Sequence, residues 1–140
     1  MAIDFGLKRI GIALSDPLLT FSYPYKTIEN SSTFFKELKS IILEMNVEKI
    51  ILGFPFEDEK ETMISMSIKK FHEDLIKNFK LEVILWDEHF TSEMAKENVI
   101  KTISKKSKRR DKGLIDRGAA AIILQEYLDR RKEEGENRIF

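Results

Sequence analysis

The stretch that decides the fold lies at the start of the chain, where residues 2–16 read AIDFGLKRIGIALSD. Large apolar residues alternate in it with small or polar ones, which is the period of a β-strand that buries one face. The residues predicted to share the apolar face are Ile3, Phe5, Ile10, Ile12 and Leu14. Between the two alternating runs, residues 6–9 form a short connection that starts with glycine, as a tight hairpin requires. Residues 2–16 are therefore predicted to form a β-hairpin.

Asp4 falls on the opposite face of the first strand, together with Ala2 and Gly6. Aspartate is disfavoured inside strands, and an unpaired charge is costly to bury. The Asp4 carboxylate is therefore expected to be paired, protonated or bound to a cation. On position alone, a hydrogen bond to a turn backbone and a role in a cation site are equally good interpretations.

The composition is that of a soluble globular protein. The chain has 140 residues, 42% of them hydrophobic and 34% charged, which suits one domain over residues 1–140 with one core. No apolar run approaches the roughly 18 residues that cross a bilayer, and no leader resembles a signal peptide. The absence of cysteine excludes disulfides and thiolate–metal sites, and two histidines argue against the usual zinc site. We therefore expect a cytoplasmic protein with no membrane partner.

The remaining chain predicts alternating strands and helices, and hence an α/β fold. Residues 21–28 are predicted to form an edge strand, because Pro24 lies inside the run. Two short apolar runs, residues 49–53 and 81–86, are expected to be buried strands that return parallel to the first. The sheet is thus predicted to have three antiparallel strands followed by two parallel ones. A first helix is expected over residues 34–45, with an N-cap among residues 30–32 and an end at Asn46. A second is expected over residues 62–78, with Met63 and Met66 as core filler. Further helices are expected after Thr91 or Ser92 and over residues 113–131, the last one followed by a charged tail.

Acidic residues recur where such a fold would gather a site. Asp87 and Glu88 follow the last apolar run, and in open α/β sheets sites form beyond the carboxyl ends of strands. Asp116 lies in the apolar stripe of the last predicted helix, where a solvated aspartate is not expected. Ala119 and Ala120 in the same stripe are small, so the helix can approach the sheet closely and carry Asp116 toward the strand ends.

The side-chain types of these acids select a class of cation. Carboxylate oxygens without histidine or cysteine favour Mg²⁺ or Mn²⁺. Together with Asp4, they predict a site for one or two such ions. Two ions about 4 Å apart suit the hydrolysis of a phosphodiester. The residues alone therefore predict metal-dependent phosphoryl chemistry.

A basic segment adds a candidate surface for nucleic acid. Residues 101–112 contain seven lysines and arginines and one acid, although the whole chain has a formal net charge of zero. Such a run is either a solvated, mobile segment or a patch that contacts a phosphate backbone. The residues considered for that contact are Lys105, Lys106, Lys108, Arg109, Arg110 and Lys112.

Four motifs carry a family resemblance that spans essentially the whole chain. They read DFGLKRIGIALSDP at 4–17, LGFP at 52–55, DEHFTS at 87–92 and KGLIDRGAA at 112–120. With these motifs in this order and spacing, the chain resembles the YqgF family, also called RuvX, whose members are described as pre-16S rRNA nucleases or Holliday junction resolvases. The resemblance implies an RNase H-like nuclease domain with a five-stranded mixed sheet flanked by helices.

The resemblance also implies which residues act. The catalytic, metal-binding acids carry over onto Asp4, Glu88 and Asp116. Family preference favours Glu88 over Asp87, and sequence alone leaves both open. Lys8 and Lys112 carry over as phosphate contacts, although Lys8 could equally be an exposed turn residue. The implied activity is Mg²⁺- or Mn²⁺-dependent hydrolysis of phosphodiester bonds in structured RNA, during 5′-end maturation of pre-16S rRNA.

Two departures from the family pattern bear on substrate contact. The arginine that usually follows the acidic pair is His89 here, which is largely neutral at pH 7 and cannot fork onto a phosphate. The loop at residues 57–61 reads EDEKE where the family carries asparagine and glycine, and its negative charge would repel a phosphate backbone.

Three alternatives therefore stay open. A resolvase of four-way DNA junctions would need two active sites and hence a homodimer, whereas an RNA nuclease can act as a monomer. A non-catalytic RNA-binding or transcription-associated module would fit the altered arginine and the acidic loop. An actin-like ATPase also opens on Asp-x-Gly, but it needs two domains, and 140 residues leave room for one.

Overall fold

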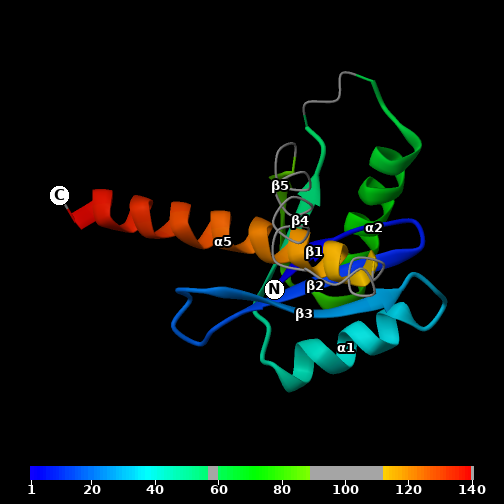
Figure 1. Ribbon diagram of the computed structural model, residues 1–140, viewed down its shortest axis with the longest axis horizontal. Coiled ribbons are helices and arrows are strands. Elements are labelled where there is room, and N and C mark those ends of the chain that lie inside the picture. Colours follow the sequence, from blue (N-terminus) through cyan, green and yellow to red (C-terminus); the bar gives the residue numbers. More distant parts are fainter. Residues whose placement is uncertain (57–59, 89–111, 140) are drawn as a thin grey trace, which may run out of the picture.

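The computed structural model describes residues 1–56, 60–88 and 112–139, which form a five-stranded mixed sheet with helices (Figure 1). The strand order is β3-β2-β1-β4-β5. β1 (Ala2–Asp4) and β2 (Arg9–Ser15) pair antiparallel, so the predicted hairpin is confirmed. β3 (Ser22–Glu29) pairs antiparallel with β2 and lies at the edge of the sheet, as Pro24 indicated.

β4 (Lys49–Phe54) and β5 (Glu82–Asp87) complete the sheet. β4 runs parallel to β1, and β5 runs parallel to β4. The predicted topology of three antiparallel and two parallel strands is therefore confirmed. Because β1, β4 and β5 share one direction, their carboxyl ends meet at the same end of the sheet.

Helices cover both faces of the sheet. α1 (Phe34–Glu44) and α2 (Met63–Phe79) pack on the face that carries the large apolar residues of the hairpin. α5 (Lys112–Ile139) packs on the opposite face, against the small side chains of Ala2 and Ala13. Figure 1 shows α5 crossing the sheet and extending beyond it with its C-terminal turns. The alternation of large and small residues in the hairpin thus decides which helix each face accepts.

The ends of α1 follow local backbone chemistry, with one correction. Thr33 is the N-cap, not a residue among 30–32, and its side chain makes no cap hydrogen bond. Asn30 is occupied elsewhere, since its amide donates to the Gly6 carbonyl at 3.0 Å. Asn46 has a φ of 52°, a left-handed conformation that asparagine tolerates, and it lies where the helix stops, as predicted.

Two helix predictions are wrong. Met63 and Met66 are not core filler, because their side chains are 74% and 56% exposed. They lie on the other side of α2 from its buried row, which consists of Ser65, Ile68, Phe71 and Leu75. The last helix does not end near residue 131, since α5 continues to Ile139. The lysine, glutamate and arginine residues of this extension favour helix, and it contains no proline.

Some predictions fall outside the described residues. The helix expected after Thr91 or Ser92 is one of them, and the acidic loop is described only at residues 60 and 61. Within the described ranges, no helix combines the length and the apolar character that crossing a membrane requires.

Candidate active site

Asp4 is the last residue of β1 and lies half-buried at the carboxyl end of that strand. Ala2, two residues earlier, packs against α5, so the alternation of the strand turns Asp4 toward the same face of the sheet. On one side, Asp4 pairs in register with Gly11 of β2. On the other side, Ile3 pairs with Leu52 of β4, and the next residue of β4 is Gly53. Asp4 is thus flanked by a glycine on each neighbouring strand.

Gly11 allows α5 to bring Asp116 onto the sheet. A Cβ atom at Gly11 would lie 2.6 Å from the backbone nitrogen of Arg117 and closer still to the carbonyl group of Asp116. No side chain fits in that space unless the helix moves. Ala119 and Ala120 are almost completely buried and continue the close approach along the helix. The small residues therefore carry Asp116 inward beside the end of β1, as the sequence predicted.

Gly53 makes room in the same way for Glu88, the first residue after β5. The Glu88 backbone N–H donates to the Phe54 carbonyl at 3.2 Å. A Cβ at Gly53 would lie 2.6 Å from Glu88 Oε2 and 2.8 Å from the Cδ1 atom of Ile123 in α5. Glu88 is half-buried, whereas Asp87 is exposed. Of the acidic pair, it is therefore Glu88 whose carboxylate lies on the face that α5 covers.

Asp116 forms an ion pair that the sequence interpretation missed. Arg9 Nε donates to Asp116 Oδ2 at 3.1 Å, and the two side chains are 38% and 23% exposed. Arg9 is the first residue of β2, and strand alternation places it on the same face as Gly11 and Ala13. That periodicity is the signal that could have found it, because the face opposite the large apolar residues is also the face of Asp4.

The first turns of α5 are anchored to β3 by polar contacts that no motif suggested. The Thr27 hydroxyl donates to the Gly113 carbonyl at 2.6 Å. The same hydroxyl oxygen accepts a hydrogen bond from Arg117 Nη1 at 3.1 Å. Thr27 pairs in register with Gly11, so this anchor lies on the strand next to the close approach. It holds the helix where Asp116 reaches the sheet.

The three acids share one face and one end of the sheet, but they do not converge on a common point. Within residues 1–56, 60–88 and 112–139, no group of three histidine, aspartate or glutamate side chains is arranged to hold a metal ion. The Asp116 carboxylate instead contacts Arg9. The chemistry of the donor set fits Mg²⁺ or Mn²⁺, because every donor is a carboxylate oxygen.

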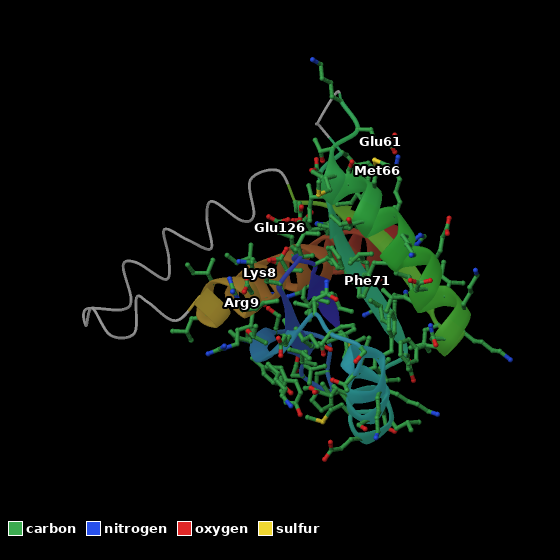
Figure 2. The ribbon with its side chains drawn as sticks, turned by 90° about the vertical axis from the view of Figure 1, so that its right-hand side faces the viewer. Lys8, Arg9, Glu61, Met66, Phe71 and Glu126 are labelled. Atoms are coloured by element: carbon green, nitrogen blue, oxygen red, sulfur yellow. The ribbon has the colours of Figure 1, made fainter. Side chains whose placement is uncertain are left out.

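Of the cationic residues predicted to contact phosphate, the structure describes few. Lys8 is exposed in the β1–β2 connection, and Figure 2 shows Lys8 and Arg9 near each other beside the first turns of α5. Lys112 is the first residue of α5. The remaining predicted contacts, together with His89, lie outside the described residues: Lys105, Lys106, Lys108, Arg109 and Arg110.

A hollow of about 520 Å³ lies apart from the three candidate acids, Asp4, Glu88 and Asp116. Met1 and Lys49, which line it, stand at the amino ends of β1 and β4, and Leu128 of α5 closes another side. The hollow therefore lies at the opposite end of these strands from Asp4 and Gly53.

Comparison with known proteins identifies the family. A family model described as "RuvX: Holliday junction resolvase" matches residues 1–130. The chain belongs to the RuvX family. A relative from Amoebophilus asiaticus is 36% identical over 134 residues, which cover 94% of each chain. A relative from Desulfitobacterium hafniense is 35% identical over 141 residues, which cover 99% of this chain and 97% of the relative. Both carry the name "Putative pre-16S rRNA nuclease".

A solved structure supports the fold of this RuvX family member. The structure titled "T. thermophilus RuvC in complex with Holliday junction substrate" matches with a TM-score of 0.55, covering 93% of this chain and 92% of that one. At 14% identity the likeness concerns the fold alone. The family resemblance and the RNase H-like fold expected from the motifs are both confirmed, and the family is one of nucleases.

Proposed function

We propose that this protein is a metal-dependent nuclease that hydrolyses phosphodiester bonds in the 5′-end maturation of pre-16S rRNA, in the cytoplasm. The observation that carries the proposal is the pair of glycines on either side of Asp4. Without side chains at Gly11 and Gly53, α5 and the Glu88 carboxylate come down on the face where Asp4 lies. The names of the relatives supply the substrate class.

The proposed cofactor is one or two Mg²⁺ or Mn²⁺ ions, and Asp4, Glu88 and Asp116 are the residues that would hold them. When bound, such ions supply Lewis-acid stabilisation of the charge that develops on the phosphate oxygens. Asp4 lies at the end of β1, Glu88 directly follows β5 and Asp116 lies in the first turns of α5, so these ions would be held between the sheet and the helix that covers it.

The other residues of the chain bind and orient the substrate. Lys8 extends from an exposed turn next to Arg9, so both can attract a phosphate backbone. The basic segment at 101–112 would add affinity without sequence selectivity. In the reaction, a water oxygen bonds to phosphorus and the bond to the 3′ oxygen breaks. The leaving oxygen takes up a proton, so the products carry a 5′-phosphate and a 3′-hydroxyl.

A cleavage assay tests the proposal. End-labelled RNA that mimics the 16S precursor and a four-way DNA junction are each incubated with Mg²⁺, with Mn²⁺ and with chelator. We expect metal-dependent cutting of the RNA, reduced by roughly 100-fold or more in Asp4→Asn and Glu88→Gln. Asp87→Asn is the matched control, because it removes the neighbouring carboxylate on the exposed side, and it should keep activity within about threefold.

The second candidate is a resolvase of branched DNA, which the description of the family model and the fold of RuvC favour. Cutting of the junction without the RNA would support it and would predict a homodimer rather than a monomer. RNA binding without cutting of either substrate would instead support a non-catalytic module and overturn the nuclease.

A further inference from the structure

The Arg9–Asp116 ion pair joins a proposed cation ligand to the first residue of β2, which directly follows Lys8 of the exposed β1–β2 connection. Arg9 Nε donates to Asp116 Oδ2 at 3.1 Å across 107 residues of sequence. The pair is partly accessible, with 38% of the Arg9 side chain and 23% of the Asp116 side chain exposed. A solvent-accessible pair of this kind can open at small cost.

A guanidinium and a divalent cation compete for the same carboxylate. Asp116 Oδ2 accepts from Arg9, and a carboxylate whose charge is partly neutralised by a guanidinium attracts a divalent cation less strongly. Two cations held close together also repel each other. Consistent with this competition, the described residues contain no converged group of three acids while Arg9 holds Asp116.

Arg9 also has the shape to bind the substrate. A guanidinium is a planar fork that matches two phosphate oxygens. Arg9 lies near Lys8 beside the first turns of α5, so a backbone phosphate at this point would meet two positive charges (Figure 2). Arg9 therefore has two anionic partners within its reach, the Asp116 carboxylate and a substrate phosphate.

We propose that Arg9 is an exchangeable counter-ion that restrains cation binding until a substrate phosphate draws it away from Asp116. The inference rests on the proposed function, since it assumes that Asp116 holds the cation. By linkage, a phosphate that releases Asp116 must tighten cation binding, and the cation must tighten phosphate binding by the same factor. Arg9 is thus a positioning residue that makes substrate and cofactor bind cooperatively.

The test measures Mn²⁺ affinity directly, by calorimetry or by the electron paramagnetic resonance of free Mn²⁺. We expect Arg9→Gln to bind Mn²⁺ roughly three- to tenfold more tightly than the wild type, as removal of a half-exposed charge beside the ion implies. Arg130→Gln is the matched control. Arg130 lies in α5, the helix of Asp116, but well away from it along the helix, and its guanidinium lies over the ring of Trp86 in β5. It should leave the affinity unchanged.

A second arm tests the cooperativity. Mn²⁺ affinity is measured with and without a phosphorothioate-linked RNA, which keeps the backbone charge and resists hydrolysis. The RNA should tighten Mn²⁺ binding in the wild type and have a clearly smaller effect in Arg9→Gln. Arg9→Lys keeps the charge without the fork, and we expect its Mn²⁺ affinity to stay nearer to that of the wild type.

The outcomes separate this inference from the function on which it rests. Weaker or unchanged Mn²⁺ binding in Arg9→Gln would show that the ion pair merely holds Asp116 in place, and would overturn the inference alone. If Asp116→Asn leaves Mn²⁺ affinity intact, the assignment of the site itself is wrong. Thermal unfolding of each variant verifies that it is folded.

Discussion

Replacing Gly11 with alanine should push α5 off the sheet at the point where it carries Asp116. The added Cβ would lie 2.6 Å from the Arg117 nitrogen and closer to the Asp116 carbonyl group, whereas ordinary contacts begin at 3.4 Å. The obstructing atoms belong to the helix backbone, so no side-chain rotation relieves the clash. The helix must therefore retreat by about 1 Å or more.

The magnitude follows from this displacement. Overpacking of a rigid core costs about 1–3 kcal/mol, and a clash with backbone belongs at the upper end of that range. With about 2.1 cal/mol/K of unfolding entropy per residue, a chain of 140 residues loses roughly 10 °C of melting temperature for 3 kcal/mol. If Asp116 is catalytic, as proposed, a shift of about 1 Å in its carboxylate should also lower cleavage by roughly 100-fold.

The assay is thermal unfolding followed by circular dichroism, with RNA cleavage measured on the same samples. Gly135→Ala is the control, since a Cβ there meets nothing within 4 Å and the residue is exposed in α5. It should raise stability by about 0.5–1 kcal/mol, as alanine favours helix over glycine. A Gly11→Ala protein that melts within about 2 °C of the wild type would refute the close approach.

Two further predictions use the same instruments. Gly53→Ala places a methyl group against the ends of the Glu88 and Ile123 side chains, which can rotate away. The variant should melt within about 3 °C of the wild type, yet its cleavage rate should fall roughly tenfold or more. An unchanged cleavage rate would contradict the placement of Glu88 in the active site. The backbone N–H of Phe21, with others of the β2–β3 turn, donates to Asp16 and lowers the pKa of that carboxyl below 3.8. The ionised Asp16 carboxylate therefore stabilises the fold above pH 3.8, and this stabilisation is lost as the pH falls through the lower pKa of the folded state. The difference in melting temperature between the wild type and Asp16→Asn should narrow over that acidic range. A difference that does not change with pH would be evidence against this role of Asp16.

Where local pattern controls structure, the sequence was sufficient. The alternation in residues 2–16 predicted the hairpin and its two faces, because the period of a strand depends only on its own backbone. Pro24 predicted an edge strand, since proline has no backbone N–H and would interrupt the hydrogen bonds of a strand with a neighbour on both sides. The same reasoning failed for Met63 and Met66, because hydrophobicity alone does not say which side of a helix meets the sheet.

For the candidate site, too, some features were predictable from the sequence and others were not. By itself, the sequence determined which acids are candidates, and the small residues of the last helix predicted that Asp116 turns inward. Only the tertiary structure decided that Glu88 rather than Asp87 lies under α5, that Gly11 and Gly53 provide the space, and that Arg9 holds Asp116. These contacts join residues far apart in the chain, so their geometry depends on how closely a helix packs on a sheet, and no local period records that distance.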